Sequence, residues 1–166
     1  AEQPGAQDNL APASYITASS SQSSDQFFIK NLIDEERAST ASSRGWRTDD
    51  GNASITFDFG TPTTFNRVDL YPSEIAGVYG GEMPTGFVLE ASDDKESWSS
   101  ITEVTGYTQK DYIPPTWRFG ETTARYLRIR FTGSNAEALS LAEVEIYHDD
   151  GTVPLPEEVT SEPSRM

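Results

Sequence analysis

NLIDEERAST, residues 31–40, is the stretch from which the fold of this chain can be worked out. The apolar pair that precedes Asp34 is expected to enter a hydrophobic core. Asp34 then opens a polar turn, in which its carboxylate, nearby backbone carbonyls and the hydroxyls of Ser39 and Thr40 supply oxygen atoms. Hard cations such as calcium take about six to eight oxygen ligands from bent backbone of this kind. A turn capped by aspartate without any metal is the alternative, and both interpretations stay open.

The rest of the sequence shows the patterns of β-strands. Polar and apolar residues alternate in 54–59, which predicts a half-buried strand. Gly60-Thr61-Pro62 is expected to end that strand, because proline cannot donate to a β-ladder. A short helix or turn is expected at 27–33, and Trp46 and Trp98 are expected in the core. Further strands are expected at 10–18, 65–71, 87–91, 116–119, 124–131 and 141–147. This pattern predicts an all-β fold, an antiparallel β-sandwich.

The composition excludes several classes of partner. Acidic residues outnumber basic ones by 27 to 12, which gives a formal net charge of −15 at pH 7. A charge of this sign repels nucleic-acid phosphates and anionic lipid, so we expect no nucleic-acid partner and no membrane insertion. The chain has no cysteine, so its fold must be stable without disulfides. These features are typical of an extracellular domain, secreted or at the cell surface.

The 166 residues suit one domain with additional segments at its ends. Residues 1–9 are polar and are interpreted as a flexible lead-in, and residues 10–148 hold the domain. Residues 149–166 are rich in proline and glutamate, so we expect an extended, self-repelling linker there. A linker implies neighbouring domains of a larger protein, and we expect the domain itself to be a monomer.

Taken in order, these segments resemble the discoidin, or coagulation factor 5/8 type C, superfamily. Within it, the chain is most similar to the family 32 carbohydrate-binding modules of secreted bacterial glycoside hydrolases. The resemblance covers residues 10–148 and implies a jelly-roll sandwich of the galactose-binding-domain type. It is carried by NLID at 31–34 with Trp46, ITFDFG at 55–60, NRVDLYP at 66–72, EASDD at 90–94 before Trp98, ARYLRI at 124–129 and LAEVEIY at 141–147.

The resemblance also implies one structural calcium ion between the first turn and the last strand. By position, its ligands would be Asn31, Asp34, Glu36, Ser39, Ala142 and Glu143, with Thr40 as the alternative to Ser39. The glycine that usually follows the aspartate in the family is Glu35 in this chain. Such a set contains only oxygen atoms, as calcium prefers.

The same resemblance implies sugar binding in the loops at one end of the sandwich. Relatives that bind galactose commonly use a histidine, an arginine and an asparagine. The only histidine of this chain, His148, is expected at an exposed strand end, and Ser73 stands where relatives often have the arginine. The galactose set is therefore not reproduced, and the preferred sugar stays open.

Six residues remain as candidate sugar contacts: five lie in predicted loops near the expected site, and Trp117 borders a proline-rich loop. Sugar rings pack on aromatic faces, and sugar hydroxyls bond to carboxylates and guanidinium groups. The alternative for the charged members is an ordinary solvated surface charge, and tryptophan also suits the interior. The candidates are Arg47, Asp49, Asp50, Glu74, Tyr79 and Trp117.

We expect no catalytic activity. The chain has one histidine, no cysteine and no Gly-x-Ser-x-Gly motif, and its paired aspartates lie in sequence typical of turns. The favoured function is a non-catalytic module that targets a larger enzyme to terminal sugars. An adhesion module for protein or lipid head groups and a structural spacer remain as alternatives.

Overall fold

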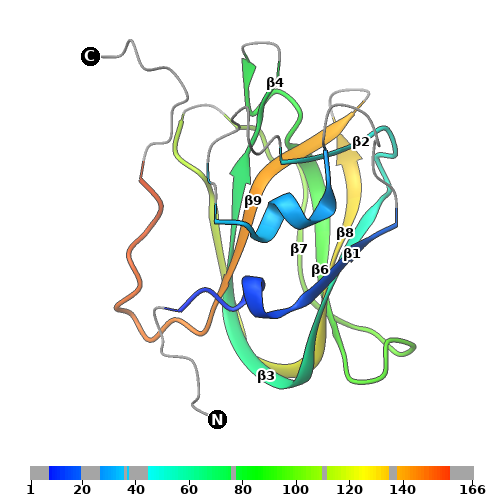
Figure 1. Ribbon diagram of the computed structural model, residues 1–166, viewed down its shortest axis with the longest axis vertical. Coiled ribbons are helices and arrows are strands. Elements are labelled where there is room, and N and C mark those ends of the chain that lie inside the picture. Colours follow the sequence, from blue (N-terminus) through cyan, green and yellow to red (C-terminus); the bar gives the residue numbers. More distant parts are fainter. Residues whose placement is uncertain are drawn as a thin grey trace.

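The computed structural model describes residues 8–19, 27–35, 37, 45–75, 78–109, 112–134 and 138–157 (Figure 1). Among these residues, no helix has the length and apolar character needed to cross a membrane. The two helical elements are short 3₁₀ turns, and all other regular elements of the described residues are strands. The elements are η1 (Ala11–Ala13), β1 (Tyr15–Ala18), η2 (Ile29–Ile33), β2 (Trp46–Thr48), β3 (Ser54–Pro72), β4 (Glu74–Ile75), β5 (Val78–Tyr79), β6 (Pro84–Ser92), β7 (Ser99–Val104), β8 (Thr116–Ser134) and β9 (Leu139–Tyr147).

Two long strands, β3 and β8, build both layers of the sandwich. They pair antiparallel from Ser54 opposite Arg130 to Asp69 opposite Thr116, with a register shift between Asp58 and Thr63. At that shift the pair bends over, at the lower end of the molecule in Figure 1. The first half of β3 pairs with β1 and the second half with β9, so the two halves lie in opposite layers. The predicted all-β sandwich is thus confirmed.

Our prediction that Gly60-Thr61-Pro62 ends a strand is wrong, because β3 runs through it. Gly60 has a φ of +78°, which suits glycine, and its N–H donates to the carboxylate of Asp58 at 2.8 Å. The tripeptide forms an irregularity in the ladder, a position that tolerates proline. We also expected two strands at 116–119 and 124–131, and these form the single strand β8.

The hydrophobic core lies between the two layers. The alternation in 54–59 places Ile55 and Phe57 in the core, both with no exposed surface. Trp46 is equally buried, as predicted, and its ring stacks on Phe131 with centroids 5.9 Å apart. Large aromatic and aliphatic side chains removed from water supply most of the favourable free energy of folding.

The predicted core position of Trp98 is wrong. Its side chain is only partly buried, and the guanidinium of Arg128 lies 4.0 Å from its ring centroid. Trp98 stands just before the edge strand β7 and contacts Tyr126 edge-on. It therefore covers charged residues of the outer sheet face instead of filling the core.

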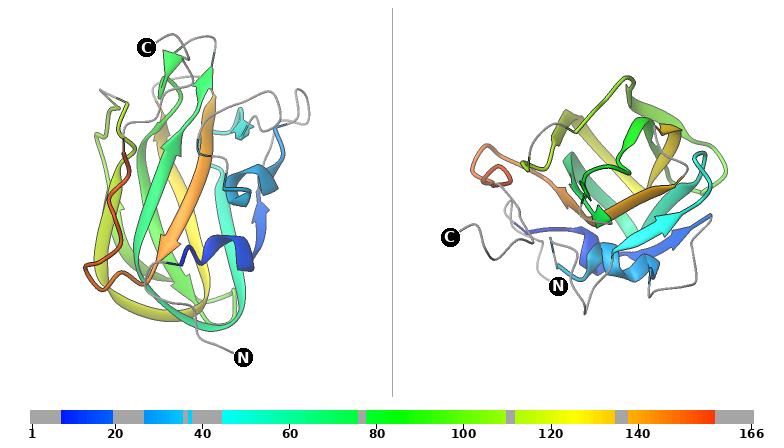
Figure 2. Two further views of the ribbon diagram at one scale, coloured as in Figure 1. Left: turned by 60° about the vertical axis from the view of Figure 1, so that its left-hand side comes forward. Right: turned by 90° about the horizontal axis from the view of Figure 1, so that it is seen from above.

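Residues 149–157, which we call the strap, pack against the outer face of β3 and β9 (Figure 2). Arg67 on β3 is fully buried and uses all of its N–H groups. Two N–H groups donate to the carboxylate of Asp69, and the other three donate to Asp149 and to the carbonyls of Val153 and Pro154. The first part of the expected linker thus lies on the sheet, while the domain boundary at residue 148 stays a prediction.

Candidate functional site

The turn after η2 connects the first part of the chain to the last strand. Leu32 has no exposed surface and anchors η2 in the core. Asp34 ends η2, and Glu35 follows with a φ of +66°. The N–H of Glu35 donates to Oε2 of Glu143 at 2.8 Å, across 108 positions of sequence. The two acidic segments noted in the sequence therefore meet.

Glu143 has the properties of a carboxylate that needs a positive partner. It has no exposed surface, and its Oε1 has no hydrogen-bond partner among the described residues. Burial raises the pKa of Glu143 most, and the carboxyl of Asp34, within hydrogen-bonding reach, raises it further, to about 10. Two facing carboxylates destabilise a buried site unless a proton or a cation lies between them. Their oxygen atoms fit a hard cation such as calcium.

The other predicted metal ligands are described in part. The side-chain amide of Asn31 donates to the carbonyl of Gly45 at 2.8 Å, and Ala142 is buried on β9. In the described residues, no group of three or more acidic, histidine or cysteine side chains could hold a metal ion. A cation at this turn would therefore need backbone carbonyls as well. Glu36, Ser39 and Thr40 lie outside the described residues.

Three of the predicted sugar contacts, Arg47 on β2, Glu74 on β4 and Tyr79 on β5, lie at the end of the sandwich opposite the bend of β3 and β8. We call this region the loop end; it contains β2, the β4–β5 hairpin and segments 80–83, 105–109 and 112–115 (upper part of Figure 1). Arg47 on β2 makes a two-pronged ion pair with Glu82, at 2.8 and 2.6 Å. Its guanidinium also lies 5.9 Å from the ring centroid of Phe27. Both charged side chains remain partly accessible, so they can also meet a ligand.

An aromatic pair lies close to these charges along the chain. The ring of Tyr79 on β5 packs against Tyr112, with centroids 4.9 Å apart. Tyr79 is partly buried, whereas Tyr112 and its neighbour Ile113 are 37% and 48% exposed. Tyr79 and Glu82 are three positions apart in the chain, so the ring pair and the ion pair both belong to the loop end. Tyr112 borders the same proline-rich loop as Trp117, and its sequence position left a core role and a platform role both open. Glu82 was not among our candidates, because nothing in the local sequence shows its pairing with Arg47.

The remaining candidates occupy different positions. Asp49 and Asp50 are exposed, and Asp50 accepts the N–H of Asn52 at 2.9 Å, as a turn residue does. Glu74 lies on β4, opposite Tyr79. Trp117 is partly buried and packs edge-on against Phe87 and Tyr107, which favours a packing role.

Ser73 shows how the loop end differs from the galactose-binding pattern. It stands where relatives often have arginine, and it is 1% exposed. Its carbonyl accepts the N–H of Gly80 at 2.9 Å, so the β4–β5 hairpin lies over it. His148, as expected, is exposed after the last strand, where it pairs with Glu121 at 2.6 Å. Neither residue offers the contacts of that pattern.

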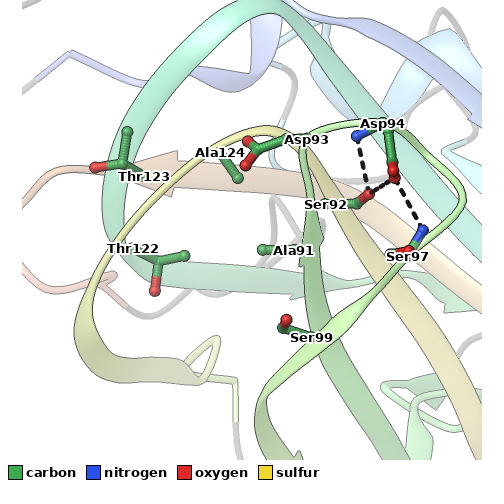
Figure 3. Close-up of a pocket in the computed structure, with 9 residues that line it drawn as sticks. All are labelled: Ala91, Ser92, Asp93, Asp94, Ser97, Ser99, Thr122, Thr123 and Ala124. Carbon is green, nitrogen blue, oxygen red and sulfur yellow. Dashed lines mark hydrogen bonds between the residues drawn. The ribbon is translucent and has the colours of Figure 1, made fainter.

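A polar pocket of about 410 Å³ lies at the opposite end of the sandwich, by the bend of β3 and β8 (Figure 3). Asp94 there accepts N–H groups from Glu96 and Ser97 and a hydrogen bond from Ser92. The two N–H groups are the main reason that the pKa of Asp94 is lowered. Its carboxylate is thus used within the turn, as the sequence predicted for this aspartate pair.

Comparisons with known proteins agree with this geometry. The sequence pattern of the F5/8 type C domain matches residues 15–144. The module CpGH89CBM32-5 from Clostridium perfringens, solved with GalNAc-β-1,3-galactose, is 20% identical with a TM-score of 0.69 over 84% of this chain and 99% of that one. A fucose-binding module from Streptococcus pneumoniae is 21% identical with a TM-score of 0.68, over 89% and 100% of the two chains.

A third similar structure is somewhat closer in sequence. It is the family 32 carbohydrate-binding module of AlyQ in complex with 4,5-unsaturated mannuronic acid. It is 28% identical with a TM-score of 0.64, over 81% of this chain and 94% of that one. No curated protein matched the chain. The matched sequence pattern, the fold and these neighbours agree, and the chain belongs to the F5/8 type C domain family.

Proposed function

We propose that this chain is a non-catalytic carbohydrate-binding module that holds a larger secreted enzyme on terminal sugars of the galactose type or related ones. The observation that carries the proposal is the loop end, which holds both the Tyr79–Tyr112 ring pair and the Arg47–Glu82 ion pair. Similar modules are solved with GalNAc-β-1,3-galactose and with a uronic acid, and another is named as fucose-binding.

The residues at the loop end can bind a sugar without doing chemistry on it. The exposed ring of Tyr112 offers an apolar face for the C–H groups of a sugar ring. The carboxylate of Glu82 can accept sugar hydroxyls, and the guanidinium of Arg47 can donate to sugar oxygens. Each of these side chains is fixed by a partner before binding, so little rotamer freedom is lost on binding.

We further propose that calcium binds between Asp34 and Glu143 and has a structural role. The buried, unpaired oxygen of Glu143 supports this proposal. When bound, the ion would supply a positive charge next to the buried carboxylate of Glu143. Asn31, Ala142, Glu36 and Ser39 or Thr40 complete the proposed ligand set.

A glycan screen tests the function, followed by titration calorimetry on the best ligand. Tyr112→Ala and Arg47→Ala should each weaken binding by about tenfold or more, as truncation of a contact residue does. Tyr15→Ala is the matched control, because Tyr15 is 67% exposed and pairs with Asp58 near the bend, away from the loop end. Equal loss in the control variant would show that the loop end is not the site.

Adhesion to a lipid head group is the second candidate, because Ile113 is 48% exposed on the loop end. Sedimentation with phosphatidylcholine vesicles tests it, since these carry no net charge to repel the acidic chain. Vesicle binding that Ile113→Ala abolishes, with no retention on any glycan, would favour this candidate. Binding to neither would leave the structural spacer.

A further inference from the structure

A groove lies between the strap and the sheet, on a different face from the loop end. Its volume is about 500 Å³, within the range of about 300–1,000 Å³ typical of small-molecule sites. Its floor comes from the second half of β3 and from β9, and Arg37 lies at its side. The lining residues are Arg37, Asp69, Tyr71, Glu145, Tyr147 and the strap residues 153–157.

The charges in this groove cancel in pairs. Arg67 holds both carboxylate oxygens of Asp69, at 2.9 and 2.8 Å. Arg37 holds both oxygens of Glu145, at 2.6 and 2.9 Å, and the hydroxyl of Tyr147 donates to the same carboxylate. Oε1 of Glu145 already accepts two hydrogen bonds, whereas Oε2 accepts one and keeps a lone pair for a further donor. The two floor carboxylates each face a guanidinium group, and Glu157 of the strap adds a negative charge, so the groove favours a neutral ligand with hydroxyl donors over an anion.

Tyr71 is the one polar side chain of the floor whose bonding is incomplete. It is 1% exposed, and its hydroxyl makes no hydrogen bond within the described part of the chain. Its ring is held in place, because the guanidinium of Arg37 lies 5.2 Å from the ring centroid. The Tyr71 hydroxyl is not among the fully buried polar atoms that lack a partner, so it opens onto the groove and can bond to a ligand there.

We propose that the groove is a second carbohydrate site, which takes a single neutral sugar ring. The hydroxyl of Tyr71 and the carboxylate of Glu145 bond to sugar hydroxyls. Val153, Pro154 and Pro156 of the strap supply an apolar wall for the C–H groups of the ring. Because the strap forms this wall, the site exists only when residues 149–157 are present. It is independent of the loop end and of the function proposed for it.

Nuclear magnetic resonance on the full, ¹⁵N-labelled chain tests the groove, with galactose, fucose and glucose as probes. At least one sugar should shift the amide signals of Tyr71, Glu145, Val153 and Leu155. Tyr71→Phe removes only the hydroxyl, so the apparent Kd obtained from these shifts should rise about tenfold. The melting temperature should stay equal or rise. Tyr112→Ala should leave the groove shifts unchanged while it removes those at the loop end.

Each other outcome overturns the second site. Shifts confined to residues of the loop end, or an unchanged Kd in Tyr71→Phe, would remove the groove and leave the proposed function intact. Binding of the cationic sugar glucosamine alone, lost at 0.5 M salt, would show a charge-driven site and contradict a neutral ligand. No shifts with any probe would overturn the groove, and a glycan screen with retention would then still support the loop end.

Discussion

Gly45 lies against the backbone of β9, just before β2 pairs with that strand. Its φ is +73°, and a Cβ there would lie 2.3 Å from the carbonyl oxygen of Leu141. Gly60 has a similar φ of +78°, but a Cβ there would meet nothing within 4 Å. A side chain at either glycine would therefore strain the backbone, but only a side chain at Gly45 would also clash with a neighbouring strand.

We predict that Gly45→Ala destabilises the protein more than Gly60→Ala does. The left-handed conformation costs about 1–2 kcal/mol in either variant. Overlap with the Leu141 backbone adds about 1–3 kcal/mol or more in Gly45→Ala only. Urea unfolding of both variants measures the difference. Equal free energies of unfolding would show that the turn can move away from β9.

Glu143 gives the second prediction at this scale, for calcium. Calcium at 1,000 times its Kd should stabilise the folded wild type by about 4 kcal/mol. The melting temperature of the wild type should therefore rise. Glu143→Gln removes a carboxylate ligand of the proposed ion, so the melting temperature of this variant should not respond to calcium or to a chelator. Asp93→Asn, on an exposed turn, should respond as the wild type does. A wild-type melting temperature that is the same with calcium and with chelator would contradict a structural site.

Among the elements, the strap depends most on a single side chain, Arg67. We predict that a chain ending at His148 loses about 2–4 kcal/mol of stability, because charge-assisted hydrogen bonds from Arg67 to the strap are lost. Arg67→Met in the full chain should cost more, about 3–5 kcal/mol, because it leaves Asp69 and Asp149 buried without a counter-charge. In the shortened chain, water reaches Arg67 instead. Chemical unfolding compares the two, and an unchanged stability after truncation would make residues 149–157 a free linker.

The pH dependence of stability should also come partly from the strap. Burial alone would raise the pKa of Asp149, but the Gly151 N–H, the Arg67 guanidinium and other donors outweigh it and lower the pKa to about 2. An aspartate with a lowered folded-state pKa stabilises the fold above its ordinary pKa of 3.8, and this stability is lost as the pH falls from there towards 2. The Asp149→Asn variant should therefore be less stable than the wild type at pH 6. Its melting temperature should also fall less than that of the wild type between pH 4 and 2. A control with Asp93→Asn should keep the wild-type slope.

The elements also show what sequence reasoning could predict. The alternation in 54–59, the short helix before Asp34 and the last strand were predicted, because they follow from local periodicity. The continuity of β3 was not predicted, because a Gly-Thr-Pro sequence is compatible both with a turn that ends a strand and with an irregularity inside one. The Arg47–Glu82 and Arg67–Asp149 pairs depend on which strands become neighbours. Such pairs cannot be inferred from residues that are 35 and 82 positions apart.

In the whole molecule, the bent β3–β8 pair separates two ends with different roles. Residues 8–10 enter at the bend end, where the N–H of Leu10 donates to the carbonyl of Ile146 near the end of β9. The loop end lies at the opposite side, with its aromatic pair and charged residues (Figure 1). The proposed sugar site is therefore presented away from the point where the chain enters the domain.

At this scale the affinity of one copy should be weak, because a short-loop site offers few contacts against the entropy cost of association. We predict that two copies joined by a flexible linker are retained on a glycan-coated surface about 10²–10⁴ times more strongly than one copy. The second binding event becomes intramolecular, and the linker sets its effective concentration. Surface plasmon resonance at several glycan densities measures the effect. A tandem in which one copy carries Tyr112→Ala should fall back to the retention of the single module, and equal retention of one and two intact copies would rule out multivalent binding.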